Sequence, residues 1–182
     1  ILARMQPREL FVVGVTHRTA PLGVRERLRL SAEAEQTFAA DLAALSDLAE
    51  FTVVNTCNRL EIYGVAAGAG TLDRVAAAFC RRQGLDHGEF APWRLDLRGK
   101  AAAEHLLAVA AGLDSQMLGE NEIFGQVKRA YAVAQTRHSA GPILNRLFQK
   151  AFQAAKHVRS NTGVTTGQVS VANVGVDIAL LL

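Results

Sequence analysis

The sequence predicts an α+β protein. Its first half is expected to contain both strands and helices, and its second half only helices. Up to about residue 97, short apolar runs rich in β-branched residues alternate with amphipathic stretches. From Lys100 onward every segment has a helical pattern, and the breaks fall near Gly112, Gly119 and Gly141. The chain of 182 residues is 49% hydrophobic, which is enough to bury a core.

The first half is predicted to contain four strands and two helices. The strands are expected at residues 10–15 (LFVVGV), 51–54 (FTVV), 60–65 (LEIYGV) and 93–97 (WRLDL). Ser31 is the expected N-cap of a helix that runs to about Leu45, and Thr71 caps a second helix through about Arg82. Residues 64–70 (GVAAGAG) are expected to form a loop. The resulting order, β-α-β-β-α-β, is that of a ferredoxin-like sandwich.

The second half is predicted to be helical throughout. Helices are expected at residues 100–111, 120–136, 143–159 and 168–182. The expected organisation is a ferredoxin-like subdomain (1–99), a helical part (100–160) and the start of a longer helix (161–182). Because the chain begins with Ile and ends on the apolar run I-A-L-L-L, we expect a fragment of a longer protein.

Composition excludes some classes of protein. The longest apolar runs, such as residues 106–111, are much shorter than the roughly 20 residues of a membrane span. Two cysteines cannot form a disulfide framework, so a reducing compartment is expected. The net charge of +3 permits nucleic-acid binding but does not require it, and with only 6% aromatic residues a large base-stacking surface is not expected.

Cys57 is the first candidate for chemistry. It falls in a short polar connection between two predicted strands, where a side chain can project outwards, and Arg59 nearby could favour the thiolate. The alternative, a small buried cysteine, stays open for Cys57. Cys80 lies in the apolar stripe of a predicted helix and fits the buried alternative better.

The five histidines show no metal-ligand spacing with one another or with cysteine, so no metal site is predicted. His105 lies among leucines on a predicted helix and is either a hydrogen-bonded core residue or a functional one. The polar residues Glu122 and Gln126 share one helical face and form either a solvated first turn or the rim of a substrate site. Gly68-Ala-Gly70 is not a dinucleotide fingerprint, because Asp73 stands at the third glycine position.

Four segments together resemble one family. They are G-V-T-H-R-T-A-P (14–21), T-C-N-R-L-E-I-Y (56–63), H-L-L-A-V-A-A-G-L-D-S (105–115) and G-E-N-E-I-F-G-Q-V-K (119–128). In order and spacing they are similar to glutamyl-tRNA reductase. A fifth segment, R-S-N-T-G-V (159–164), resembles the passage of that family into its long spinal helix.

The resemblance implies an activity and its partners. The family reduces glutamyl-tRNA to glutamate-1-semialdehyde with NADPH, in the first committed step of tetrapyrrole synthesis. It implies an NADPH-binding domain and a dimerisation domain beyond residue 182, a cytoplasmic homodimer, and a possible contact with the aminotransferase that acts next. The fragment would then hold the thioester-forming site and retain at most an esterase activity.

The resemblance also implies roles for particular residues. Cys57 would be the nucleophile and His105 the histidine needed for activity. The expected substrate-binding residues are Thr56, Asn58, Arg59, Ser115, Glu120, Asn121, Glu122 and Gln126. Arg59 would hold the substrate carboxylate with its planar fork of donors. The competing function is a non-enzymatic RNA-binding module, against which the strands show no paired aromatics.

Overall fold

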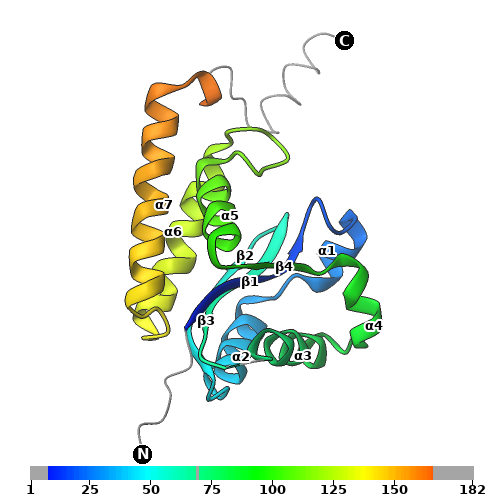
Figure 1. Ribbon diagram of the computed structural model, residues 1–182. Coiled ribbons are helices and arrows are strands. Elements are labelled where there is room, and N and C mark those ends of the chain that lie inside the picture. The colour runs from blue at the N-terminus through cyan, green and yellow to red at the C-terminus, as the bar shows by residue number, and fades with distance from the viewer. Residues whose placement is uncertain (1–7, 69, 166–182) are drawn as a thin grey trace, which may run out of the picture.

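A four-stranded antiparallel sheet forms the centre of the molecule (Figure 1). The computed structural model describes residues 8–68 and 70–165. The strands are β1 (Glu9–Thr16), β2 (Leu48–Asn55), β3 (Arg59–Ala66) and β4 (Leu95–Arg98). They pair in the order β2-β3-β1-β4, and each pair is antiparallel. The predicted α+β class and the four predicted strands are confirmed.

Helices cover both faces of the sheet. On one side lie α2 (Ala32–Ala43) and α3 (Thr71–Gln83), and on the other α5 (Gly99–Ala111), α6 (Asn121–Thr136) and α7 (Pro142–Asn161) (Figure 1). Shorter helices are α1 (Leu22–Leu28), α4 (His87–Phe90) and the 3-10 turns Ala91–Trp93 and Gly163–Thr165. Among the described helices, none combines the length and the apolar character that a membrane span requires.

Two hydrophobic cores result, one on each face of the sheet. Val13, Val53 and Ile62 pack against α2 and α3, whereas Val12 and Tyr63 pack against α5, α6 and α7. Because side chains of a strand alternate between faces, a sheet covered on both sides needs apolar residues at consecutive positions. The cover on both faces explains the unbroken apolar run in β1. The helices α5, α6 and α7 share a hydrophobic core with the sheet.

Several boundaries differ from the sequence prediction. The short helices α1 and α4 were not predicted, and β4 begins at Leu95 because the Ala91–Trp93 turn precedes it. Gly64 belongs to β3 and not to a loop, since a Cβ there would lie 2.4 Å from the ring of Phe11. Close packing across the sheet, and not a turn, requires this glycine.

The N-cap of α2 is Ser31, as predicted: its side chain accepts a hydrogen bond from the backbone N–H of Ala34 at 3.1 Å. The N-cap of α3 is Gly70, and Thr71 is the first helical residue, so the prediction of a Thr71 cap is wrong. The Thr71 hydroxyl instead donates to the carboxylate of Asp47. The helix predicted at 168–182 lies outside the described residues.

A buried carboxylate from the edge strand caps α7. Glu50 on β2 accepts hydrogen bonds from the backbone N–H groups of Ile143, at 3.1 Å, and Leu144, at 2.7 Å. A negative charge at a helix N-terminus satisfies N–H groups that have no partner within the helix. Gly141 is required beside it, because a Cβ there would lie 2.6 Å from the Glu50 side chain.

Replacing Glu50 with Ala should therefore loosen the start of α7. We expect a loss of about 1–3 kcal/mol in the free energy of unfolding, since one buried and one partly buried N–H group lose their acceptor. Urea denaturation followed by circular dichroism measures this loss. Glu26→Ala, at an exposed position on α1, is the matched control, and equal stability of the two variants would contradict the capping role.

Candidate functional site

A tight turn between β2 and β3 presents Cys57 to solvent. The backbone N–H of Thr56 donates to the carbonyl of Arg59 at 2.8 Å, and the buried Thr56 hydroxyl accepts from the N–H groups of Asn58 and Arg59 at 3.2 and 3.1 Å. A threonine hydroxyl used in this way fixes the shape of a turn. Cys57 is exposed, so of the two alternatives left open for it the buried one is wrong, whereas Cys80, on α3, is buried as expected.

The guanidinium of Arg25, on α1, forms hydrogen bonds to the same turn. Its Nη1 donates to the carbonyl of Cys57 at 3.1 Å and to Oδ1 of Asn58 at 2.7 Å, and its Nε donates to the carbonyl of Ala20 at 3.2 Å. The side chain is 7% exposed. The guanidinium in contact with the Cys57 turn is thus that of Arg25, which the sequence did not single out.

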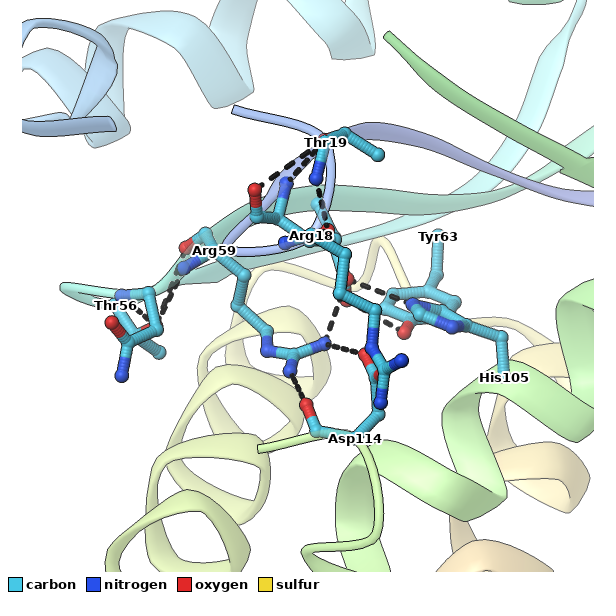
Figure 2. A network of polar contacts seen from close by, with 10 residues as sticks. Arg18, Thr19, Thr56, Arg59, Tyr63, His105 and Asp114 are labelled. Carbon is cyan, nitrogen blue, oxygen red and sulfur yellow. Dashed lines mark hydrogen bonds and ion pairs between the residues drawn. The ribbon is translucent and has the colours of Figure 1, made fainter. Parts of the chain in front are cut away.

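Arg59 points into the protein, beneath the turn (Figure 2). Its Nη1 pairs with Glu61 at 2.9 Å and with the Asp114 carboxylate at 3.3 Å, and its Nη2 donates to the carbonyl of Asp114. The side chain is 1% exposed. Asp114 also pairs with the exposed Arg18 at 2.5 Å, so this carboxylate joins a buried and a surface arginine.

Glu61 is the centre of the buried network. One of its carboxylate oxygens pairs with Arg59 and lies 2.8 Å from Nε2 of His105, and the other accepts from the Tyr63 hydroxyl at 2.7 Å. Burial alone would raise the pKa of Glu61, but the charge of Arg59 and the hydrogen bonds from His105 and Tyr63 lower it to about 2. Burial and the charge of Glu61 raise the pKa of Tyr63, so its hydroxyl stays protonated.

The ionised Glu61 defines which nitrogen of His105 carries a proton. A carboxylate only accepts, so Nε2 of His105 carries the N–H that points at Glu61. His105 is 12% exposed and its ring stacks on Tyr63 with centroids 6.4 Å apart. It therefore has a hydrogen-bonded partner, as expected for a core histidine, and it also belongs to the network that contains Arg59.

The loop from Gly112 to Glu120 brings α5 and α6 to this network. Gly112 and Gly119 both have positive φ near 78°, and the N–H of Gly119 donates to the carbonyl of Gly112 at 2.7 Å. A Cβ on Gly112 would lie 2.9 Å from Cα of Gly119. The closed loop places Asp114 against Arg59, and the Oγ of neighbouring Ser115 is buried without a hydrogen-bond partner among the described residues.

The other expected substrate residues lie at the start of α6. Arg159 of α7 donates to the side chain of Asn121 and, at 2.6 Å, to the carbonyl of Glu120. Glu122 is exposed and Gln126 half-buried. The structure thus brings Thr56, Asn58, Arg59 and Ser115 around the Cys57 turn and the Asp114 loop, and ties Glu120 and Asn121 to α7. Within the described residues, no side-chain hydrogen bond or ion pair connects Glu122 or Gln126 to either group.

Glu61 and Tyr63 were not predicted as site residues, although the sequence contained a signal for them. Arg59, Glu61 and Tyr63 alternate along β3, so they share one face of the strand. An R-x-E-x-Y pattern on an otherwise apolar strand indicates a buried ionic cluster.

His17, at the end of β1, adds a buried Nδ1 without a hydrogen-bond partner among the described residues. Burial lowers its pKa, and the charges of Arg59, Arg18 and Arg25 act in the same direction, against Asp114.

The depressed pKa of Glu61 predicts a pH-dependent stability. The carboxylate of Glu61 binds a proton more weakly in the folded protein than in the unfolded chain, where its pKa is near 4.5. Its stabilising effect is therefore complete above about pH 5 and is lost as the pH falls towards 2. The loss is on the order of 3 kcal/mol. Urea denaturation at a series of pH values measures it. In Glu61→Gln this part of the acid limb should disappear, and an unchanged acid limb would contradict the assignment.

No group of three His, Cys, Asp or Glu side chains placed to hold a metal ion occurs among residues 8–68 and 70–165. The site is instead an exposed thiol on a rigid turn, above a buried cluster of arginines, carboxylates and a histidine. By its fold and site, the chain is an α+β domain with an exposed cysteine on a turn between two strands of its sheet.

Comparison with known proteins specifies the family. Residues 13–162 match the family model described as glutamyl-tRNAGlu reductase, N-terminal domain. The chain is 40% identical over 171 residues to the glutamyl-tRNA reductase of a Synechococcus species, covering 93% of this chain and 40% of that protein. It is 39% identical over 172 residues to that of Syntrophotalea carbinolica, covering 92% and 38%.

A solved structure agrees with these relatives. The glutamyl-tRNA reductase from Methanopyrus kandleri superposes with a TM-score of 0.73 at 29% identity, over 93% of this chain and 39% of that one. The chain belongs to the glutamyl-tRNA reductase family. It spans about 40% of the length of the curated relatives it matches.

Proposed function

We propose that this chain carries the site at which a glutamyl-tRNA reductase takes the glutamyl group from its tRNA. The thiolate of Cys57 attacks the ester carbonyl, a C–S bond forms, and the C–O bond to the tRNA breaks. The 3′ oxygen of the tRNA takes up a proton and leaves, so the product is a thioester on Cys57. The observation that carries the proposal is the exposed Cys57, held on a turn that Thr56 and Arg25 fix from within.

His105 is proposed to handle the proton of this step. Its Nε2–H is held by Glu61, which leaves Nδ1 as the nitrogen that can accept or deliver a proton. Glu61 then acts as a positioning residue, because it orients the imidazole and selects its tautomer. The hydrogen bond from Tyr63 keeps the carboxylate itself in place.

Two buried atoms support a substrate-binding role for Arg59 and Ser115. The Nε of Arg59 and the Oγ of Ser115 have no hydrogen-bond partner among the described residues. Buried polar atoms are nearly always paired, so atoms left over at a candidate site favour a ligand that supplies the partner. We propose that these donors receive the substrate carboxylate, while the two terminal nitrogens of Arg59 stay with Glu61 and Asp114. Asn58, Glu120, Asn121, Glu122 and Gln126 complete the proposed substrate site.

The described residues do not fit the dinucleotide reductant that the family implies. A pyrophosphate would need the N-terminus of a helix that follows a glycine-rich turn, and α3 after Gly70 is the nearest candidate. The carboxylate of Asp47 already occupies that position, since it accepts from Thr71 and pairs with Arg74. We therefore assign the acyl-transfer half of the reaction to this site and derive no hydride step here.

We further infer a ferredoxin-like arrangement for the sheet. In support of it, α2 connects β1 to β2 and α3 connects β3 to β4, both on the same face, with the strand order β2-β3-β1-β4. The homodimer, the cytoplasmic location and the aminotransferase partner stay predictions of the family resemblance.

The test is to mix the protein with tRNA charged with glutamate and to analyse the peptide containing Cys57 by mass spectrometry. We expect one glutamyl group on Cys57 and its slow release as free glutamate, with or without NADPH. Uncharged tRNA is the control. Retention of the tRNA without any adduct would overturn the proposal in favour of an RNA-binding module, and NADPH-dependent semialdehyde would show a cofactor site in this chain.

A further inference from the structure

A long stretch of the chain contains no acidic residue. From Ile123 to Thr165 there is no Asp or Glu, although the whole chain has 17. The same stretch carries seven cations: Lys128, Arg129, Arg137, Arg146, Lys150, Lys156 and Arg159. With a net charge of +3 for the chain, +7 here leaves −4 for the rest. The positive charge is therefore concentrated in α6 and α7.

Most of these cations are exposed, because the two helices bury apolar residues instead. In α6 the buried residues are Ile123, Val127, Tyr131 and Ala134, and in α7 they are Leu144, Phe148, Ala151 and Ala155. Six cations are exposed, and we call this surface the α6–α7 basic face: Lys128, Arg129, Arg137, Arg146, Lys150 and Lys156. The helices α6 and α7 themselves lie on the side of the sheet away from α2 and α3 (Figure 1), but Arg137, just after α6, lines a hollow together with residues of α2.

Among the described residues the basic face lacks ion pairs with carboxylates, a property that it shares with the exposed Arg27, Arg29 and Arg81. Six arginines elsewhere pair with a carboxylate: Arg18, Arg59, Arg74, Arg82, Arg94 and Arg98. Within the part of the chain that the structure describes, no cation of the basic face is paired with a carboxylate. Lys150 donates to the amide oxygen of Gln153 at 3.2 Å, and Lys128 lies over the ring of Phe124. Concentrated like charges repel one another, and a bound polyanion would offset this repulsion.

The C-terminal end of α7 contacts the start of α6, next to the loop that reaches the candidate site. Arg159, at the end of α7, binds Asn121 and the carbonyl of Glu120 at the start of α6. The loop that leads into α6 carries Asp114, which pairs with Arg59 under the Cys57 turn. The 20 residues of α7 extend about 30 Å from this end towards Pro142. A tRNA whose aminoacyl end reaches Cys57 has the rest of its stem outside the site, within reach of such a surface.

We propose that the α6–α7 basic face binds the phosphate backbone of the tRNA and so positions the aminoacyl end at Cys57. The proposal rests on the proposed function, because that function supplies the RNA. The contacts are electrostatic and read no sequence, since Lys and Arg on the face of a helix neutralise phosphates without touching base edges. The face supplies affinity, and the Cys57 site supplies recognition of the glutamyl group.

The test measures binding of uncharged tRNA over a series of salt concentrations, which requires neither Cys57 nor an ester. Arg146→Gln and Lys150→Gln should each reduce the slope of log K against log salt by about 1, and the double variant by about 2. Arg81→Gln, an exposed arginine of α3 on the opposite side of the sheet, is the matched control and should leave the slope unchanged. Circular dichroism confirms folding, and Lys156→Gln replaces any variant that fails to fold.

The outcomes separate this proposal from the proposed function. Slopes that fall as expected support the basic face even if no glutamyl adduct ever forms on Cys57. An adduct that forms while the Gln variants bind tRNA with the wild-type slope overturns the basic face alone. Failure to bind tRNA, or an equal fall in slope for Arg81→Gln, also overturns it, and binding only to vesicles rich in phosphatidylserine would assign the face to a membrane surface instead.

Discussion

Replacing Cys57 with Ser should abolish the glutamyl adduct and leave the fold intact. Cys57 is exposed and its turn is held by backbone and hydroxyl hydrogen bonds that do not use the thiol. Serine is nearly isosteric with cysteine, but its hydroxyl is a much poorer nucleophile than a cysteine thiolate. We expect adduct formation to fall by at least about 1,000-fold, the scale on which loss of a covalent nucleophile is felt. Mass spectrometry after reaction with charged tRNA measures it.

Cys80→Ser is the control for this variant. Cys80, on α3, is 1% exposed in the core between the sheet and the helices α2 and α3, and burial raises the pKa of its thiol. It should therefore contribute nothing to the adduct, and an alkylating reagent should modify Cys57 well before Cys80. If Cys57→Ser forms the adduct at the wild-type rate, the nucleophile is another group and the proposed function fails.

Local patterns were sufficient to predict the sheet and the long helices. The apolar run of β1, the Ser31 cap and the Cys57 turn depend on residues adjacent in the chain, and each is confirmed. The helix α1 was missed because it has only seven residues and no side-chain cap at Pro21. Such a short segment has no clear period and depends on tertiary packing.

The site was predictable only in part, because its contacts are distant in sequence. Arg25 and Asn58 are separated by 33 residues, and Arg59 and Asp114 by 55. No periodicity or spacing connects such pairs. The sequence indicated Arg59 as a charge beside Cys57 and a partner of the substrate carboxylate, and its burial in an ionic network was not predicted. The alternation of Arg59, Glu61 and Tyr63 along β3 indicated the buried charges. Their partners, His105 of α5 and Asp114, come into contact with them only through the packing of α5 and its following loop on the sheet.

Replacing Arg59 with Met should cause a large loss of stability. Met removes the cation but keeps much of the side-chain volume, and it leaves the fully buried carboxylate of Glu61 without its main counter-charge. Removing one partner of a buried ion pair costs about 3–5 kcal/mol. Urea denaturation at pH 7 measures this loss. Lys100→Met is the control, because Lys100 and its partner Glu104 are both exposed and their pair should contribute little.

A second substitution in the same background decides whether the cause is the uncompensated charge. Gln at position 61 is neutral and can still hydrogen-bond to Tyr63 and His105, so the double variant Arg59→Met/Glu61→Gln contains no unpaired carboxylate there. We expect Glu61→Gln to restore about 1–3 kcal/mol when Arg59 is Met, although alone it destabilises the protein. If the two losses simply add, the Arg59–Glu61 charges do not interact as the geometry indicates, and Arg59 stabilises the protein through packing alone.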